Sequence, residues 1–373
     1  MDFSLVASAF EALHFPPPSR LVLLEAQTLS SAHVPSFPPD APALITGLAS
    51  RELALQVGTV LLAVYPEGHE VFLVNPLAVS EGGQKNFVSL RLGDFVVKGV
   101  SDQVFSPSAC LYVPGLGEGT SFESFQEIVA HLRAPNGCPW DMEQTHASLR
   151  KHLLEESYEA LAALDSQDFA SMCEEFGDLL LQIMLHSQIA CVEGEFTAND
   201  VVKGIYDKIV RRHPHVFGDV KVGGVDGVLQ NWEKLKEKER KGKGEQKKGI
   251  LDGVPLAFPA LSQAQEYQDR AARVGFDWPV IDDVLDKVAE EMQEVKDAET
   301  DFELADEIGD LFFVLVNFAR WKKVDAESAL RGANLKFKKR FGYIETNAKA
   351  QARNLSDMKL EEMDALWNEA KKK

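Results

Sequence analysis

Apolar side chains recur at intervals of three and four residues over most of the chain beyond about residue 120, which is the spacing of one helix face. The clearest case has two such sets separated by a short polar break near Ala298 to Asp301. Because the break is short, we expect two helices that fold back on each other as an antiparallel pair. Their apolar positions are Val284, Leu285, Val288, Met292 and Val295 in the first, and Ile308, Leu311, Phe312 and Leu315 in the second.

Residues 1–118 show a different pattern. Prolines at 16–18 and 38–39 make helices improbable near the start of the chain. Ser50 can cap a helix that continues through Tyr65. Short apolar runs predict strands at Ala43–Leu48, Glu70–Val74, Phe87–Leu92 and Ala109–Val113. This part of the chain is therefore predicted to be a small α/β segment.

The remaining residues predict helices throughout, so the fold class is mainly α. Thr120 to Glu123 has the form of a capping box, and a helix that begins at Thr197 should end at Arg212, before His213 and Pro214. Further helices are expected at Pro259–Arg273, around Lys336–Arg340, and around Trp232 and Trp367. We expect a first helical repeat at 119–240, a charged linker at 241–250 and a second helical repeat at 251–373.

Carboxylates line the predicted helix pair of the second repeat. Glu291 and Glu294 are three residues apart on one helix, and Glu307 and Asp310 are three apart on the other. Four carboxylates on facing helices cannot all ionise unless a cation neutralises them, and oxygen ligands of this kind suit Mg²⁺. For any single Glu-x-x-Glu pair, an acidic solvated helix face is the more common explanation.

A second copy of the pattern argues against solvated faces. Glu156 and Glu159 match the first pair at an offset of 135, and Glu175 and Asp178 match the second pair at an offset of 132. We assign the three-residue difference to the loop between the helices, where length changes cost little. The match extends downstream, because Lys208–Arg212 corresponds to Lys336–Arg340, and Trp232 corresponds to Trp367. Internal duplication therefore favours a functional site.

Net charge, cysteine spacing and the absence of long apolar runs argue against several classes of protein. A formal net charge of −19 over 373 residues argues against nucleic-acid binding, which needs a basic face. The four cysteines form no Cys-x-x-Cys pair, and neither a basic leader nor an apolar run of membrane-spanning length is present. We therefore expect a cytoplasmic protein that binds no membrane.

Metal-holding carboxylates beside a basic helix suggest a nucleotide phosphate site. Lys336 and Arg340 are four residues apart and share a helix face, where they can pair with phosphate charge. Trp367 can either pack on a base or sugar or anchor the last helix. With no Ser-His-Asp or Cys-His arrangement evident, the expected nucleophile is a water positioned by a carboxylate.

These motifs together resemble the MazG family of nucleoside triphosphate pyrophosphohydrolases. The resemblance covers about 120–373, and it implies an all-α homodimer that uses Mg²⁺ to hydrolyse nucleoside triphosphates to monophosphate and pyrophosphate. By position it implies that Glu291, Glu294, Glu307 and Asp310 hold metal in the C-terminal repeat, which the family generally uses for activity. The same correspondence implies that the nucleotide contacts are Lys287, Lys336, Arg340, Trp367 and Lys371. The motifs are Gly137–Asp141, Glu155–Glu159, Glu175–Asp178, Arg211–Phe217, Val274–Trp278, Glu290–Glu294 and Glu307–Asp310.

Residues 27–114 resemble, more weakly, the C-terminal half of a tetrapyrrole methylase domain. The glycine-rich half that holds S-adenosylmethionine has no counterpart here, which disfavours a methyltransferase, and the glycines at 115–119 are interpreted as a linker. The main alternative to a house-cleaning nucleotide hydrolase is a non-catalytic nucleotide sensor of the same fold, and two complete carboxylate sets favour the hydrolase.

The two repeats are not expected to be equally active. Arg212 precedes His213 and Pro214 and so should lie on a last, fraying helical turn, whereas the helix that carries Arg340 can continue. Because catalysis by positioning is sensitive to small displacements, we expect the C-terminal repeat to carry most of the turnover.

Overall fold

A computed structural model describes residues 3–76, 87–97, 104–225, 227–228, 231–232, 235, 239 and 249–372. Two compact units are present, one formed by Met1–Ser157 with Glu175–Val201 and the other by Tyr158–Glu174 with Val202–Lys373. The predicted domain bounds remain predictions, and most of the expected linker, 241–248, lies outside the described residues.

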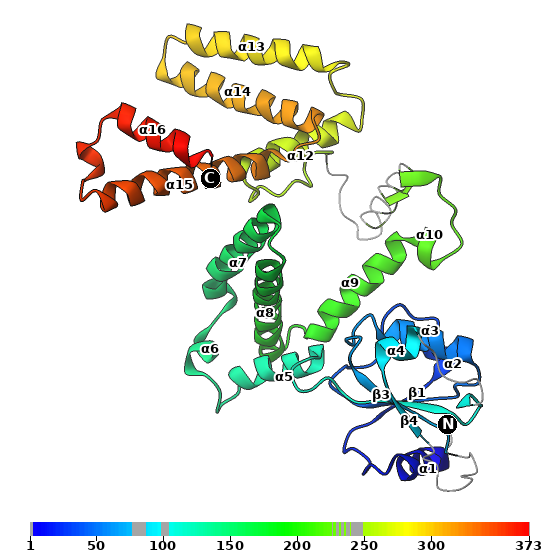
Figure 1. The fold of residues 1–373 in the computed structure, drawn as a ribbon. Coiled ribbons are helices and arrows are strands. Elements are labelled where there is room, and N and C mark those ends of the chain that lie inside the picture. The colour runs from blue at the N-terminus through cyan, green and yellow to red at the C-terminus, as the bar shows by residue number, and fades with distance from the viewer. Residues whose placement is uncertain are drawn as a thin grey trace. The chain divides into compact units, whose positions relative to one another are not determined.

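The N-terminal part of the first unit is built on a five-stranded sheet (Figure 1). The strand order is β1-β2-β5-β3-β4, with β1 and β2 parallel and the other neighbours antiparallel. The register pairs Ile45 with Leu111 and Leu73 with Leu111, so the middle strand β5 is bonded on both edges. The strands are β1 (Val22–Glu25), β2 (Ala43–Thr46), β3 (Glu70–Val74), β4 (Phe87–Arg91) and β5 (Cys110–Val113).

Helices cover both faces of this sheet. On one face, β-strand residues such as Ile45 and Leu111 are fully buried together with Leu61 and Phe95 from the helices. On the other face, Phe10 and Leu13 pack against Phe72. The helices are α1 (Phe3–Leu13), α2 (Ala26–Leu29), α3 (Arg51–Leu61) and α4 (Leu92–Val97).

The α/β prediction is confirmed, with corrections. The four predicted strands and the helix capped by Ser50 are present, although that helix ends at Leu61 and not at Tyr65. The expectation that helices are improbable near the start is wrong for α1, because its apolar face packs on the sheet and it ends before the prolines. Strand β1 and helices α2 and α4 were not predicted from the sequence, because these elements are only four to six residues long and show no clear periodicity.

The first helix after the α/β segment is capped by Ser121 and not by Thr120. Ser121 caps α5 (Phe122–Leu132) through a hydrogen bond from the Ser124 amide, whereas the Thr120 hydroxyl donates to the carbonyl of Gly117. The predicted capping box is therefore displaced by one residue, since a serine is available at both 121 and 124. The other helices are α6 (Pro139–Glu143), α7 (His146–Ser166), α8 (Phe169–Glu193), α9 (Ala198–Arg212) and α10 (Pro214–Phe217).

The hairpin of the first repeat corrects another expectation. Only Gln167 and Asp168 separate α7 from α8, whereas Ala298 to Thr300 separate the corresponding helices of the second repeat. The additional residues of the first repeat therefore extend α7 beyond Glu159, and they do not lengthen the loop. Extension is possible because this stretch, Ala160 to Ser166, contains neither glycine nor proline.

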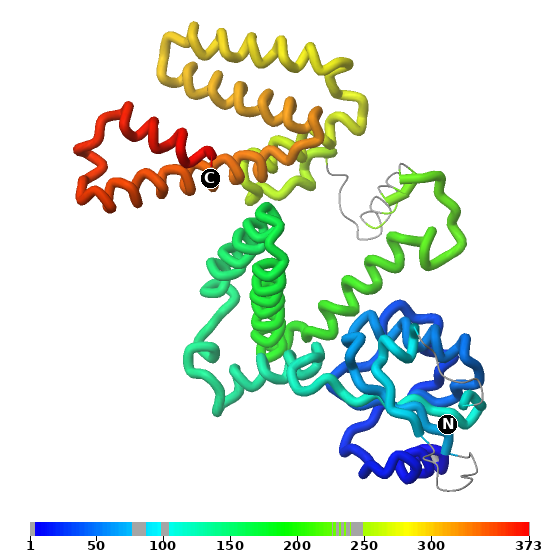
Figure 2. The backbone as a smooth tube through the Cα atoms, in the orientation of Figure 1, coloured from blue at the N-terminus to red at the C-terminus, as the bar shows by residue number. Residues whose placement is uncertain are grey.

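The second helical repeat is organised as two hairpins. Thr300 caps α14 with a capping box to Glu303, and Figure 2 shows α13 and α14 side by side. Helices α15 and α16 form the other hairpin. The predicted elements are confirmed as α12 (Ala260–Ala272), α13 (Ile281–Asp297), α14 (Asp301–Trp321), α15 (Ala326–Ala350) and α16 (Leu360–Ala370). Within the described ranges, no helix combines the length and apolar character needed to cross a membrane.

Candidate functional site

The antiparallel pair α13–α14 brings together three of the four carboxylates predicted for the second repeat. Oxygen atoms of Glu291 and Glu294 from α13 and of Glu307 from α14 all lie within 4.8 Å of one another. Asp310 follows Glu307 by one helical turn on α14. Because these oxygens come from two packed helices, the helical spacing of three residues produces a compact acidic group, which we call the C-terminal cluster.

Glu291 is the buried member of this cluster. Only 3% of the residue is exposed, and its Oε1 lies 2.7 Å from Nζ of Lys287. Its Oε2 is buried and accepts no hydrogen bond from the described residues. A buried carboxylate oxygen without a donor is costly, so the position fits a ligand atom for a cation.

Repulsion between the carboxylates of the C-terminal cluster changes the protonation equilibrium of Glu307. Partial burial raises the pKa of Glu307, and the neighbouring carboxylates of Glu294 and Glu291 raise it further. Hydrogen bonds to Glu290 and Glu291 raise the pKa of Lys287. Hard oxygen donors from three or four carboxylates are the ligand type that Mg²⁺ prefers, so the residues present fit this ion.

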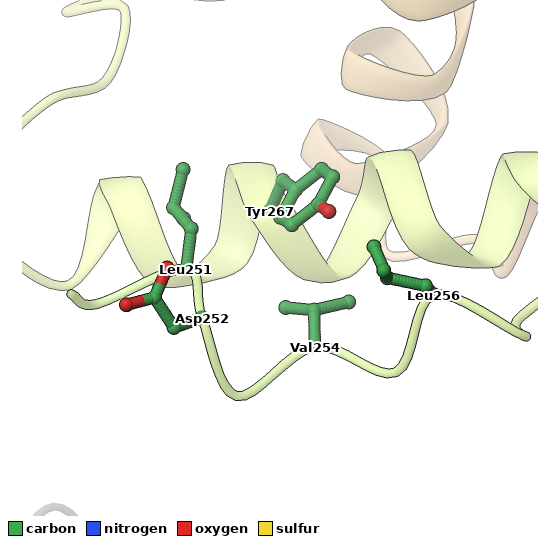
Figure 3. A pocket seen from close by; sticks show the side chains of 5 residues that line it. All are labelled: Leu251, Asp252, Val254, Leu256 and Tyr267. Carbon is green, nitrogen blue, oxygen red and sulfur yellow. The ribbon is translucent and has the colours of Figure 1, made fainter. Parts of the chain in front are cut away.

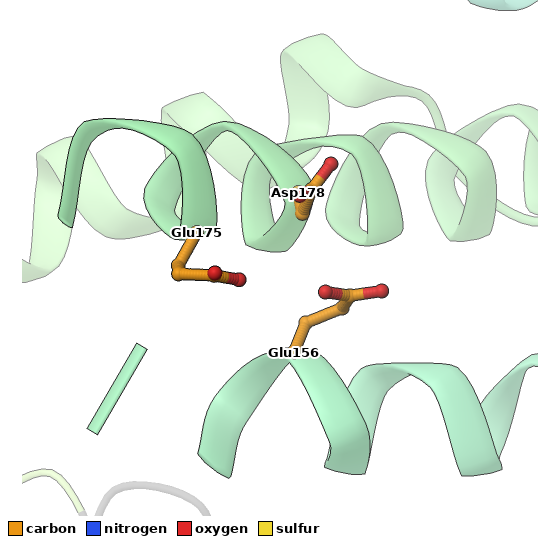
Figure 4. Close-up of side chains that lie close together, drawn as sticks. All are labelled: Glu156, Glu175 and Asp178. Atoms are coloured by element: carbon orange, nitrogen blue, oxygen red, sulfur yellow. The ribbon is translucent and has the colours of Figure 1, made fainter. Parts of the chain in front are cut away.

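The first repeat forms a similar group, which includes Asp178 and not Glu159, whereas the C-terminal cluster includes Glu294 and not Asp310. In Figure 4, Glu156 on α7 points toward Glu175 and Asp178 on α8. Oxygen atoms of the three lie within 4.8 Å of one another. We call this group the N-terminal cluster; Glu159 follows Glu156 by one turn of α7. The duplication predicted from the sequence is thus reproduced as two similar arrangements of carboxylates.

One position beside the clusters differs between the repeats. Lys287 lies one turn before Glu291, and at the matching offset the first repeat has His152. Nδ1 of His152 lies 3.3 Å from Oε2 of Glu155, a residue outside the N-terminal cluster. This difference between lysine and histidine was not predicted, although the offset of 135 residues between the repeats makes it visible.

The basic helix α15 continues past Arg340, as predicted. The guanidinium carbon of Arg340 lies 5.5 Å from the ring centre of Trp367, and the ring of Phe337 lies 5.2 Å from that of Trp367. Trp367 therefore packs α16 onto α15, which agrees with its interpretation as an anchor of the last helix. Lys336 is exposed, and Lys371 donates a hydrogen bond to Asn368.

The structure does not bring these basic groups to the carboxylates of the same repeat. Among the described residues, no hydrogen bond or ion pair joins Lys336, Arg340 or Lys371 to the C-terminal cluster. Of the basic residues that the family resemblance assigns to nucleotide, Lys287 alone contacts that cluster in the described structure.

In the first repeat, the corresponding arginine has a carboxylate partner. Helix α9 ends at Arg212, as predicted. Nη2 of Arg212 lies 2.6 Å from Oε2 of Glu239, and Nε of Arg211 lies 2.8 Å from Oε1. The Arg212 side chain is 18% exposed, so this pair holds it in place. The fraying expected of Arg212 stays a prediction, and the contact with Glu239 is a further difference between the repeats.

A separate depression lies at the start of the second repeat. Its volume is about 300 Å³, and Figure 3 shows Tyr267 of α12 opposite the segment that carries Val254 and Leu256. Leu251 and Asp252 complete the lining, and none of the predicted site residues contributes to it. The depression is mostly apolar and offers one carboxylate, so the clusters remain the candidate chemical sites.

Comparisons with known proteins agree with the repeat structure. Residues 144–217 and 281–343 each match the MazG nucleotide pyrophosphohydrolase domain. The chain is 41% identical to the uncharacterized protein YabN of Bacillus subtilis, over 99% of this chain and 74% of the relative. It is 42% identical to the nucleoside triphosphate pyrophosphohydrolase/pyrophosphatase MazG of Thermotoga maritima, over 68% of this chain and 96% of the relative. It is 43% identical to the nucleoside triphosphate pyrophosphohydrolase of Escherichia coli K12, over 66% of this chain and 95% of the relative.

Proposed function

We propose, from the premise that this chain belongs to the MazG nucleotide pyrophosphohydrolase family, that it hydrolyses nucleoside triphosphates to nucleoside monophosphate and pyrophosphate with Mg²⁺. The observation that carries the proposal is the C-terminal cluster, with the unpartnered buried oxygen of Glu291 at its centre. The named relatives from Thermotoga maritima and Escherichia coli support the same activity.

The proposed reaction uses water as the nucleophile. A water oxygen attacks the α-phosphorus, the bond from that phosphorus to the α–β bridging oxygen breaks, and pyrophosphate leaves with the electron pair. Glu291, Glu294, Glu307 and Asp310 would hold Mg²⁺, which would supply Lewis-acid neutralisation of the phosphate charge. One of these carboxylates accepts a hydrogen bond from the attacking water and so orients it toward phosphorus.

Basic side chains complete the proposed site. Lys287 lies at the cluster and can reach a phosphate oxygen from there. Lys336 and Arg340 lie one turn apart on α15, where both can face a triphosphate, and Lys371 can contribute from the last turn. Arg340 is presented on the ring of Trp367, so the tryptophan can hold the guanidinium in position as well as contact the nucleotide.

A homodimer would account for the apolar side chains left exposed on the site hairpin. On α13, Leu285 and Met292 are 46% and 48% exposed, and Phe312 on α14 is 56% exposed. Large apolar groups gathered on one hairpin are typical of an association surface. A second copy can also supply basic residues that do not reach the C-terminal cluster within one chain.

The repeats have different proposed roles, with most turnover in the C-terminal repeat. Arg212 is paired with Glu239, so a phosphate must displace a carboxylate to reach it, whereas Arg340 stacks on an aromatic ring. This difference adds to the expected fraying of Arg212 as a physical reason for the asymmetry. In the cell, we propose a cytoplasmic house-cleaning role that removes unwanted nucleoside triphosphates.

The matched variants Glu294→Gln and Glu159→Gln test this assignment. Both remove one charge at equivalent positions of the two repeats. Pyrophosphate release is measured for a panel of NTPs and dNTPs with and without Mg²⁺, and circular dichroism monitors the helices. We expect Glu294→Gln to lose nearly all activity and Glu159→Gln to lose far less. Nucleotide binding without Mg²⁺-dependent pyrophosphate release in the unaltered chain would instead identify a sensor.

A further inference from the structure

A positive charge already lies against the proposed metal ligands of the C-terminal cluster. Nζ of Lys287 lies 2.7 Å from Oε1 of Glu291 and 3.9 Å from Oε2 of Glu294. It also lies 2.8 Å from Oε1 of Glu290. The ammonium group thus contacts or approaches two of the carboxylates that share the cluster.

Because Glu291 is buried, its carboxylate needs a neighbouring cation whenever no metal ion is bound. Glu291 is almost completely buried, and an unpaired buried carboxylate is strongly unfavourable. The other carboxylates of the cluster add repulsion. Lys287 lies one turn before Glu291, and its side chain is 28% exposed, so the ammonium can neutralise the carboxylate while keeping access to water.

We propose that Lys287 is an internal counter-cation that stabilises the metal-free C-terminal cluster and competes with Mg²⁺ for it. This inference rests on the proposed function, because it takes the cluster to be the metal site. An ammonium about 5 Å from a divalent ion repels it, and even at the dielectric constant of water the repulsion lowers affinity by about tenfold or more. Movement of the ammonium away from Oε1 of Glu291 would relieve this repulsion.

The first repeat lacks this lysine. His152 occupies the matching position, and its imidazole lies 3.3 Å from a carboxylate oxygen of Glu155, which is outside the N-terminal cluster. A ring held there replaces a long flexible ammonium side chain. The two clusters of one chain consequently differ in metal affinity, and the cluster beside Lys287 binds metal more weakly when nucleotide is absent.

The first test measures metal affinity at the C-terminal cluster alone. The full chain carries Glu156→Gln and Glu175→Gln to disable the N-terminal cluster, and it is titrated with Mg²⁺ by calorimetry and with Mn²⁺ by paramagnetic resonance, without nucleotide. Adding Lys287→Gln should tighten metal binding by about tenfold or more, because one opposing charge is lost. Lys287→Arg keeps the charge and should stay within about threefold of the parent chain.

The reciprocal test uses the first repeat. In a full chain with Glu294→Gln and Glu307→Gln, the variant His152→Lys should weaken metal binding at the N-terminal cluster, by about the factor gained in the first test. Thermal unfolding gives an independent readout. Without metal, Lys287→Gln should lower the unfolding temperature, and added Mn²⁺ should raise it more than in the parent chain.

The outcomes separate this inference from the proposed function. If the parent chain binds no metal, the metal assignment itself fails, and the competition with it. If the parent binds metal but Lys287→Gln leaves the affinity unchanged, Lys287 serves substrate binding or structure only, and the competition is rejected. Weaker metal binding by Lys287→Gln would show that the lysine positions the ligands and does not oppose the ion.

Discussion

Asp40 provides a sharp test of how the α/β segment is joined to the first helical repeat. Its Oδ2 accepts a hydrogen bond of 2.7 Å from the hydroxyl of Ser121, the residue that caps α5. The Asp40 side chain is 9% exposed, and Ser121 is 6% exposed. The segment between 114 and 121 is therefore attached to the α/β segment, and it is not a free linker as its glycines suggested.

The expected cost of Asp40→Ala follows from this geometry. A hydrogen bond to a charged group contributes about 1.5–3 kcal/mol, and after its loss the Ser121 hydroxyl keeps Oγ of Ser124, 2.8 Å away, as a partner. Ser121 can still cap α5, since it retains the amide of Ser124 as a donor at 3.1 Å. We therefore expect Asp40→Ala to lower the free energy of local opening around 115–125 by about 2 kcal/mol, while α5 itself still forms.

Hydrogen exchange measured by mass spectrometry can follow this change directly. If the free energy of local opening falls by about 2 kcal/mol, amide exchange becomes roughly 30-fold faster in peptides that cover 115–125. Thr120→Ala is the control, because it removes an exposed hydrogen bond of the same segment, 2.8 Å to the carbonyl of Gly117. Equal exchange in Asp40→Ala and the wild-type protein, or an equal effect of the control, would refute the reasoning.

Three further predictions concern Gly115, Glu362 and Glu307. A Cβ on Gly115 would lie 2.4 Å from the carbonyl oxygen of Asp40, so Gly115→Ala should cost about 1–3 kcal/mol in denaturant unfolding, while Gly68→Ala, with open space around it, should be nearly neutral. A hydrogen bond from Arg353 lowers the pKa of Glu362 to about 2, so its stabilising contribution is complete above about 4.5 and is lost as the pH falls toward about 2; the difference in unfolding temperature between wild type and Glu362→Gln should shrink over that range. The pKa of Glu307 is raised, so the metal-free protein should lose stability as the pH rises above about 4.5, and a pH series in a chelator should show less of this loss in Glu307→Gln.

Local rules were enough to predict the helices that carry the carboxylates. The apolar spacing in Val284 to Val295 and in Ile308 to Leu315 predicted α13 and α14, and a period of 3.6 residues then placed Glu291 beside Glu294 and Glu307 beside Asp310. Antiparallel packing followed from the short break. The C-terminal cluster was therefore predictable because helix period and hairpin length determine it almost completely.

Other features depend on tertiary contacts that no local pattern records. Helix α1 forms because Phe10 and Leu13 find an apolar sheet face, whose existence could not be inferred from the helix itself. The cap of α5 lies at Ser121 because Asp40, distant in sequence, holds that hydroxyl. The pairing of Arg212 with Glu239 similarly joins two segments whose approach depends on the path of the intervening chain.

The same distinction explains why duplicated motifs need not give duplicated behaviour. The carboxylates of both clusters are placed by backbone period, so a repeat that keeps the helices keeps the ligands. The charges around them are placed by side-chain length and by the nearest available partner. Lys287 reaches inward to Glu291, whereas the shorter His152 lies against Glu155. Substituting one flanking residue can thus change the electrostatics of a cluster while every carboxylate is retained, so differences between the repeats are expected in the flanking residues as well as in which carboxylates approach one another.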